Sequence, residues 1–268
     1  MPSESESIAL RSTDRDGAVV SLTLNRPSVG NAYNGELIDA LHDELDEVEA
    51  AESIRVAVLR GNGPHFQAGA DLKWLDRVAR SSPEENLEAS RRTAELARRI
   101  DRLPVPTVAL VRGGCFGGGT GLIASCDVVI AADDSRFAIS ETRRGMVAGI
   151  ILPQLANAIG LRHLRRLALT GEVFDSQEAM RIGLAHIVCP SQEIEERCSR
   201  VVESILLGAP GATAATKKSL GELAAVAVPE SLCDALVRQH ADLRQTDEAA
   251  EGIASFQEKR KPAWTDLI

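Results

Sequence analysis

Aromatic residues are scarce in this chain, since five Phe, two Trp and one Tyr make up 3% of its 268 residues. So few rings leave little with which to stack nucleic-acid bases. Basic residues are also outnumbered: 30 Lys and Arg stand against 39 Asp and Glu, for a net charge of −9. Because that charge repels phosphate backbones, we expect no nucleic-acid partner. The core must be filled by aliphatic side chains.

Long hydrophobic runs are missing as well. The longest, at 106–111 and 128–132, fall far short of the roughly 20 residues that cross a bilayer. The first seven residues are polar and acidic and do not resemble a secretory or mitochondrial signal. We therefore expect no membrane partner and a cytoplasmic location.

Cysteine is present without a recognisable framework. The five cysteines are odd in number and form no C-x-x-C pair, which favours reduced packing thiols over disulfides or a zinc site. The sequence also lacks H-E-x-x-H, G-x-S-x-G, G-x-x-x-x-G-K-[ST] and an intact G-x-G-x-x-G. These absences argue against zincins, serine hydrolases, P-loop enzymes and simple dinucleotide binders.

What is present is an alternating pattern of strands and helices. Apolar runs at 8–11 and 18–24, with a turn at 14–17, predict a hairpin. Asn34 is expected to cap a helix, because the residues after it are apolar at three- and four-residue spacing: Leu37, Ala40, Leu41, Leu45 and Val48. Strands at 55–60, 107–111 and 127–132 alternate with helices at 83–102 and 118–125. This order predicts an α/β fold with parallel strands and crossover helices.

The second half of the chain is mostly helical. From residue 152 only 186–188 predicts a strand. We expect a catalytic α/β region at 1–200 and a helical C-terminal region at 201–268. Apolar helical faces that a small domain cannot cover predict a homo-oligomer.

Two loops rich in Gly and Ala are candidates for chemistry. They span residues 66–73 and 113–121, and each follows a predicted strand and leads into a helix. Small side chains let a ligand reach backbone N–H groups, and two such donors on one oxygen form an oxyanion hole. The same glycines are equally compatible with tight turns and close packing alone.

Taken in order, these segments resemble the crotonase, or enoyl-CoA hydratase/isomerase, superfamily. The resemblance is carried by LNRP at 24–27, NA at 31–32, FQAGADLK at 66–73, LPVPT at 103–107, the glycine loop, CD at 126–127, FAISETRRG at 137–145, LTG at 169–171 with Ala179, Gly183 and Leu184, and EKRKP at 258–262. It implies a spiral of repeated ββα units, trimers or dimers of trimers, and an acyl-CoA thioester substrate. Coenzyme A would enter as part of that substrate, and no metal or other cofactor is implied.

The resemblance also assigns site residues. It implies an oxyanion hole made by the N–H groups of Ala70 and Gly118. The backbone along the CoA path would be that of Ala68, Gly69, Ala70, Asp71 and Leu72.

Two glutamates are usual in hydratases of the family, and only one is present here. Gly121 stands at the position of the first, and Glu141 at that of the second. Glu141 is also placed where an ordinary helix start, after Ser140, would favour an acidic residue. The resemblance identifies Glu141 as a catalytic acid and base, and the chain is most similar to a single-glutamate branch that includes methylglutaconyl-CoA hydratases.

The sequence therefore predicts an enoyl-CoA hydratase with one catalytic carboxylate. A Δ3,Δ2-enoyl-CoA isomerase and a non-catalytic CoA-binding relative are the alternatives. Arg143 or Arg144 is a candidate partner for a carboxylate at the far end of the acyl chain, although a solvated helix face also explains them. The loop residues His65 and Gln67 are more typical of bystanders, and the arginines at 91, 92, 98, 99 and 102 are predicted to form a solvated face.

Overall fold

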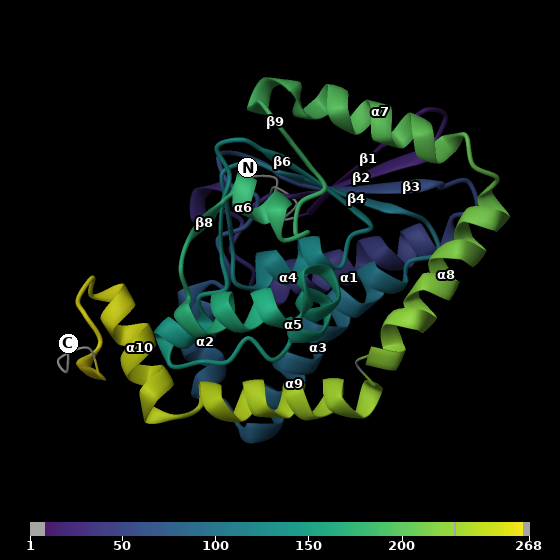
Figure 1. The fold of residues 1–268 in the computed structure, drawn as a ribbon. Coiled ribbons are helices and arrows are strands. Elements are labelled where there is room, and N and C mark those ends of the chain that lie inside the picture. Colours follow the sequence, from purple (N-terminus) through teal and green to yellow (C-terminus); the bar gives the residue numbers. More distant parts are fainter. Residues whose placement is uncertain (1–8, 228, 265–268) are drawn as a thin grey trace, which may run out of the picture.

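The computed structural model describes residues 9–227 and 229–264 of the chain (Figure 1). It begins with an antiparallel hairpin of β1 (Ala9–Asp14) and β2 (Val19–Leu24). Arg15, Asp16 and Gly17 turn the chain with φ of 53°, 57° and 85°. The predicted hairpin is confirmed, although Ile8, its first predicted residue, lies outside the described residues.

The main sheet has the strand order β1-β2-β3-β4-β6-β9. It adds β3 (Val56–Gly61), β4 (Thr107–Val111), β6 (Val128–Ala132) and β9 (Ile187–Cys189) to the hairpin. Every pairing after the hairpin is parallel. The expected parallel sheet with crossover helices is therefore correct.

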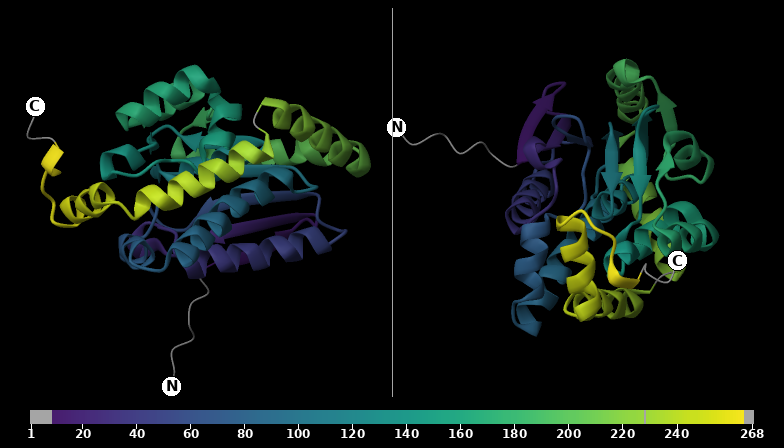
Figure 2. Two further views of the ribbon diagram at one scale, coloured as in Figure 1. Left: turned by 90° about the horizontal axis from the view of Figure 1, so that it is seen from below. Right: turned by 90° about the vertical axis from the view of Figure 1, so that its left-hand side faces the viewer.

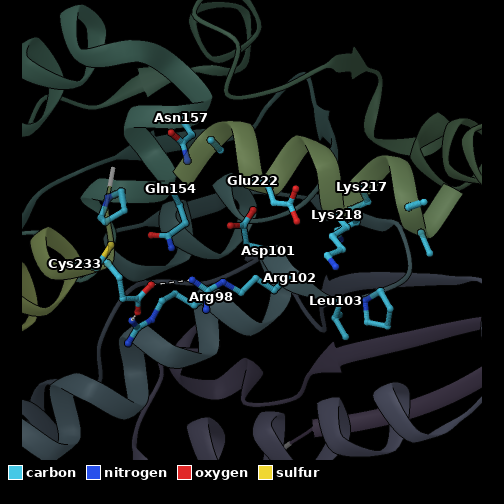
Figure 3. A pocket seen from close by; sticks show the side chains of 17 residues that line it. Arg98, Asp101, Arg102, Leu103, Gln154, Asn157, Lys217, Lys218, Glu222 and Cys233 are labelled. Carbon is cyan, nitrogen blue, oxygen red and sulfur yellow. Dashed lines mark hydrogen bonds and ion pairs between the residues drawn. The ribbon is translucent and has the colours of Figure 1, made fainter. Parts of the chain in front are cut away.

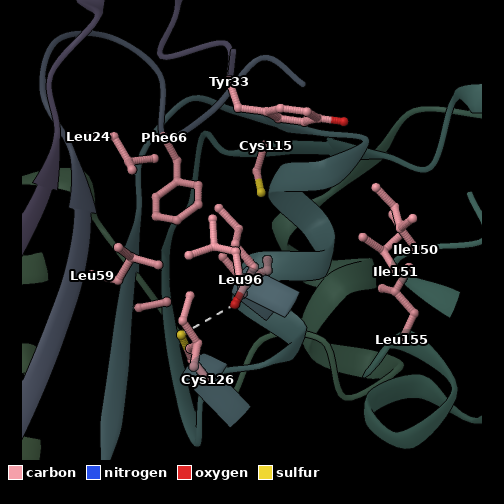
Figure 4. Packing of buried hydrophobic residues seen from close by; sticks show 14 of the residues in the cluster. Leu24, Tyr33, Leu59, Phe66, Leu96, Cys115, Cys126, Ile150, Ile151 and Leu155 are labelled. Carbon is pink, nitrogen blue, oxygen red and sulfur yellow. Dashed lines mark hydrogen bonds between the residues drawn. The ribbon is translucent and has the colours of Figure 1, made fainter. Parts of the chain in front are cut away.

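Side chains on this sheet alternate between two cores. Ala57 and Leu59 of β3 face the larger one, which lies under α1 (Gly35–Ala50) and α3 (Pro83–Arg102). Val56 and Val58 face a smaller core covered by α7 (Ile194–Leu206). Figure 4 shows part of the larger core, where Phe66 lies near Leu24 and Leu59 and Tyr33 lies at the border. Aliphatic packing on both faces follows from the two-residue period of a strand.

A second, small sheet was not predicted from the sequence. It has the order β5-β7-β8, from β5 (Gly114–Phe116), β7 (Arg136–Ala138) and β8 (Phe174–Asp175). After β4 the chain passes through β5 into α4 (Gly118–Ala124), and after β6 it passes through β7. Each repeat thus places one strand in each sheet, which is the ββα repetition that the resemblance implies.

Local capping explains where the helices begin. Asn34 accepts a hydrogen bond from the Leu37 N–H at 3.0 Å, which confirms it as the cap of α1. A capping box between Ser82 and Glu85 starts α3. The middle of the chain adds α2 (Leu72–Ala79), α5 (Leu152–Thr170), which is interrupted at Gly160, and α6 (Ser176–Arg181).

The C-terminal helices are α8 (Pro210–Ala227), α9 (Glu230–Arg244) and α10 (Asp247–Gln257). Seen from below, α9 crosses the molecule beside α3 (Figure 2). Buried Arg244 ties the two helices, because its Nε donates to Asn86 Oδ1 at 2.8 Å. Helix α10 packs against α2 and the short helix at Glu141–Arg144. Among the described residues, no helix combines the length and apolarity that crossing a membrane demands.

Candidate functional site

The two glycine-rich loops are paired with each other by backbone hydrogen bonds. The N–H of Phe66 donates to Arg112 O at 2.8 Å, and the N–H of Phe116 donates to Gln67 O at 2.9 Å. Residues Gln67 and Cys115 form a parallel bridge. The loops therefore run side by side, and α2 and α4 begin where they end.

The hydrogen bonds within these loops use some of the backbone N–H groups and leave others unpaired. The amides of Gly69, Asp71 and Gly117 are used, because they donate to Gln67 Oε1, Tyr33 O and Ala138 O. Within the described part of the chain, the amides of Ala70 and Gly118 have no acceptor. Gly118 is the first residue of α4, where a helix leaves its N–H unpaired. These are the two residues predicted to form an oxyanion hole.

Both residues line a cavity of about 550 Å³. Its walls include every predicted substrate-binding residue, namely Ala68, Gly69, Ala70, Asp71, Leu72 and Gly118, together with Glu141. The structure thus brings the whole predicted site together. The cavity is a concave space with a few polar groups, the usual form of a small-molecule site.

The glycines have packing reasons of their own. A Cβ on Gly118 would lie 2.5 Å from Tyr33 Cε1, and one on Gly119 would lie 2.7 Å from Gln67 Oε1. Gly117 adopts φ of 51° and faces Glu141, whose Oε1 would lie 3.1 Å from an added Cβ. The loops therefore require glycine for close packing at these positions.

Glu141 stands at the start of a short 3-10 helix, Glu141–Arg144, that follows β7. Its Oε2 is enclosed and has no hydrogen-bond partner among the described residues. Burial raises the pKa of this carboxyl above its ordinary value of 4.5, although Arg144 and nearby backbone amides oppose the shift. A buried carboxyl with a raised pKa is suited to accept and return a proton near neutral pH.

The alternative of a helix start is confirmed in part. Ser140 precedes the short helix and Glu141 is the acidic residue of its first turn. Ser140 makes no side-chain cap, and its Oγ instead accepts a hydrogen bond from Arg144 Nη1 at 2.7 Å. The helix start therefore accounts for an acidic residue here, while the enclosed, unpartnered Oε2 is a feature that a helix start does not require.

Gly121 lies buried on α4, and the space beside it is filled. A Cβ added there would lie 2.1 Å from Cγ2 of Ile151. No larger side chain fits unless Ile151 moves. The resemblance aligns Gly121 with the first glutamate of two-glutamate hydratases, and the packing of Ile151 leaves no space for a glutamate at this position.

Asp71 contributes backbone to the cavity while its side chain is structural. Its Oδ1 accepts from the N–H of Lys73 at 3.0 Å and caps α2, and its Oδ2 lies 3.0 Å from Arg26 Nη2. Burial alone would raise its pKa, but the hydrogen bonds from Arg26 and the helix amides outweigh burial and lower it. The carboxylate of Asp71 is thus held in place by the α2 amides, and its charge is balanced by Arg26.

The two candidate arginines are separated by the fold. Arg143 is exposed and its Nε donates to Thr170 O at 3.1 Å, away from the cavity. Arg144 lines the cavity, with its guanidinium carbon 4.4 Å from the centroid of the Phe256 ring. Only Arg144 can contact a ligand in this cavity.

The loop residues His65 and Gln67 act as expected of bystanders. His65 Nδ1 accepts from the Gly114 N–H at 2.9 Å, and the side chain of buried Gln67 accepts from the Gly69 N–H.

The arginine-rich face of α3 is less solvated than predicted, since the side chains of Arg98 and Arg99 are only 14% and 16% exposed. They pair with carboxylates of α1, α3 and α9, so that prediction was wrong for these two residues. All five cysteines are free, and four of them are buried.

Sequence reasoning missed several residues that line the cavity, among them Tyr33, Met146, His240 and Phe256. Tyr33 is the only tyrosine of the chain and follows a motif that carried the resemblance, so its rarity was a usable signal. His240 and Phe256 belong to the C-terminal helices, where nothing local marks them. His240 Nδ1 lies 2.6 Å from Val147 O and its Nε2 lies 3.4 Å from Arg244 Nη1, so both ring nitrogens are engaged.

A larger cavity, of about 690 Å³, lies between α3, α5, α8 and α9 (Figure 3). Three of its charged side chains are paired with one another, since Arg98 and Arg102 both contact Glu230. It contains neither glycine loop nor Glu141. Within the described residues, no group of three or more His, Cys, Asp or Glu side chains is arranged to hold a metal ion.

Comparison with known proteins agrees with this geometry. Residues 14–267 match the family profile described as Enoyl-CoA hydratase/isomerase. The 2,3-dehydroadipyl-CoA hydratase of Escherichia coli is 33% identical over 250 residues, which is 92% of this chain and 95% of that protein. The trans-2-decenoyl-[acyl-carrier-protein] isomerase of Streptococcus mutans is 28% identical over 93% of this chain and 95% of its own. A crystal structure of an enoyl-CoA hydratase from Mycobacterium avium superposes with a TM-score of 0.85, at 31% identity, over 97% of this chain and 99% of that one.

Proposed function

Because the chain belongs to the enoyl-CoA hydratase/isomerase family, we propose that it adds water across the double bond of an α,β-unsaturated acyl-CoA thioester. The observation that carries the proposal is Glu141, a buried carboxyl with a free oxygen in the cavity that also holds two unpaired amides. A base beside an oxyanion hole is the arrangement that enolate chemistry requires.

In the proposed reaction, the amides of Ala70 and Gly118 hold the thioester oxygen. Glu141 takes a proton from water as the water oxygen bonds to Cβ, and the π electrons move onto the thioester oxygen as an enolate. Glu141 then returns the proton to Cα, and the enolate collapses to the 3-hydroxyacyl thioester. Each amide donor is worth about 3–4 kcal/mol of transition-state stabilisation at such a site. Coenzyme A is part of the substrate, and the proposed reaction needs no other cofactor.

A double-bond isomerase is the second candidate, and the packing of Ile151 against Gly121 favours it. Moving a double bond needs one group that removes a proton at one carbon and returns it at another, and Glu141 alone suffices. The Streptococcus mutans relative carries an isomerase name. A non-catalytic CoA-binding role is the third candidate, and the retained carboxyl speaks against it.

The deciding experiment is turnover of crotonyl-, 3-methylcrotonyl-, 3-methylglutaconyl- and 3-enoyl-CoA thioesters in heavy-oxygen water, with products identified by mass. Hydration predicts a product that contains the heavy oxygen. A rearranged product without added oxygen would identify an isomerase instead. CoA binding without any product would support the non-catalytic role.

Assembly and location remain parts of the proposal. Leu169 at the end of α5 and Val173 beside it are 73% and 59% exposed, a feature typical of a buried subunit contact. We propose a cytoplasmic homo-oligomer, a trimer or a dimer of trimers. Sedimentation velocity should give a species several times the 28.6 kDa of one chain, and Leu169→Glu should shift it toward the monomer; a monomeric native protein would refute this part.

A further inference from the structure

Tyr33 is held between the two candidate oxyanion residues. Its N–H donates to Gly69 O at 2.9 Å and its carbonyl accepts from the Asp71 N–H at 2.8 Å, so its backbone brackets Ala70. Its ring lies against Gly118, where it leaves no room for a Cβ. Trp74 supports the ring edge-on, with the centroids 5.6 Å apart. Backbone hydrogen bonds on either side of Ala70, the contact with Gly118 and the contact with Trp74 therefore fix the position of this side chain.

The phenol oxygen faces away from the aliphatic core. Figure 4 shows the hydroxyl of Tyr33 pointing away from Leu24, Leu59 and Phe66. The side chain lines the cavity that contains Glu141, although the residue is only 8% exposed. The described residues offer this hydroxyl no hydrogen bond, but the enclosed oxygen without a partner is Oε2 of Glu141. Buried polar groups are nearly always hydrogen-bonded, so this enclosed oxygen indicates a bound polar molecule in the cavity that the side chain of Tyr33 also lines.

The electrostatic surroundings keep this phenol neutral. Burial, with a smaller effect from Glu141, raises its pKa well above the ordinary value, and Arg244 only partly opposes the shift. The other ionisable residues that line the cavity are Arg26, Asp71, Lys73, Arg144 and His240. Burial followed by the charge of Arg244 lowers the pKa of His240 to about 4. Tyr33 therefore cannot act as a base at neutral pH, but its oxygen remains a hydrogen-bond acceptor.

We propose that Tyr33 and Glu141 together hold the attacking water, with the phenol oxygen of Tyr33 in the role of the carboxylate that Gly121 cannot supply. One hydrogen of the water is accepted by Glu141 and is transferred to it as the C–O bond forms. The other hydrogen is accepted by Tyr33 Oη, stays on the oxygen and becomes the hydroxyl hydrogen of the product. This inference rests on the proposed hydration and adds a second catalytic residue to it.

Two reactions of the same site can be compared to decide whether Tyr33 holds the attacking water or only supports the structure of the site. Hydration needs the water, whereas exchange of the α-hydrogen of a saturated acyl-CoA with deuterated solvent needs only Glu141 and the oxyanion hole. Tyr33→Phe keeps the ring, the Trp74 contact and the Gly118 contact. We expect it to lower the kcat of hydration about 10- to 100-fold, with little change in KM. Its α-deuterium exchange, followed by mass spectrometry, should remain within twofold of the native rate.

Two control variants accompany the measurement. Glu141→Gln should lose both reactions, and Trp74→Phe, which disturbs the packing of Tyr33 but keeps its hydroxyl, should change both by the same factor. Native hydration rates in Tyr33→Phe would overturn the inference, as would a parallel loss of both reactions. Failure of the native protein to hydrate any thioester would instead refute the proposed function, so the two outcomes are distinguishable.

Discussion

At the scale of the residue, the proposed chemistry depends on one carboxyl, that of Glu141. Glu141→Gln preserves the shape of the side chain and removes the proton acceptor, so turnover should fall at least about 100-fold. Because burial raises the pKa of Glu141, the acid limb of the kcat/KM profile should lie above pH 4.5. A pH–rate profile of the native protein and turnover of the variant test both points. Glu222→Gln, in the larger cavity, serves as the matched control; equal activity of the two variants would contradict the assignment.

A second residue-scale prediction concerns Arg144, the candidate arginine that lines the cavity. Its Nη1 is held by Ser140, and its planar guanidinium has further donors for a carboxylate. Arg144→Met should lower kcat/KM for 3-methylglutaconyl-CoA about tenfold more than for crotonyl-CoA. The control is Arg143→Met, which should leave the ratio of the two substrates unchanged. An Arg144→Met variant with an unaltered ratio would show that this arginine does not select carboxylated chains.

Residue-level prediction from sequence depended on local motifs. The resemblance assigned the backbone donors of Ala70 and Gly118 and the carboxyl of Glu141, because each lies in a family motif, and the roles of these residues stay predictions. Tyr33, Met146, His240 and Phe256 were missed because their place in the cavity is set by packing between segments far apart in the chain. The ion pairs of Arg98 and Arg99 were missed for the same reason, since their partners include residues of α1 and α9.

At the scale of the element, α9 is fastened to the loop before α5 by His240. Its Nδ1 lies 2.6 Å from Val147 O, and burial is the main cause that lowers its pKa to about 4. The unfolded chain binds this proton at the ordinary value of 6.5 and the folded chain does not, so the free energy of unfolding should fall as pH drops from about 6.5 to about 4. His240→Gln should show a shallower fall in chemical denaturation over this window. Parallel profiles for the two proteins would contradict the linkage.

The elements themselves were predictable to different degrees. Helix α3 and strand β4 have the predicted bounds, because each combines a long or fully apolar pattern with clear end signals. The small sheet was missed because its strands have three, three and two residues, too few to show a two-residue period. Pairing between distant loops, rather than local sequence, makes these residues strands.

At the scale of the whole molecule, the C-terminal helices close the cavity. Gly252 of α10 packs directly on the helix of Glu141, since a Cβ there would lie 2.4 Å from the carbonyl oxygen of Arg144. Gly252→Val should displace α10 and Phe256, raise KM several-fold and lower the melting temperature by several degrees, because overpacking typically costs about 1–3 kcal/mol. Steady-state kinetics and thermal melts test this. Gly221→Ala on α8, where an added Cβ meets nothing within 4 Å, is the control and should keep native KM; unchanged KM in Gly252→Val would show that α10 is not needed for binding.

The packing of Ile151 on Gly121 also limits which single substitutions this chain can accept at positions 121 and 151. If a carboxylate residue is introduced at position 121 first, its Cβ would lie 2.1 Å from Cγ2 of Ile151 and clash with it. Trimming Ile151 first would open a cavity in the core, at a cost of about 2–5 kcal/mol for Ile→Ala. Both orders pass through a disfavoured intermediate, so the two sites are epistatic. A two-carboxylate site in this fold would therefore require both changes together.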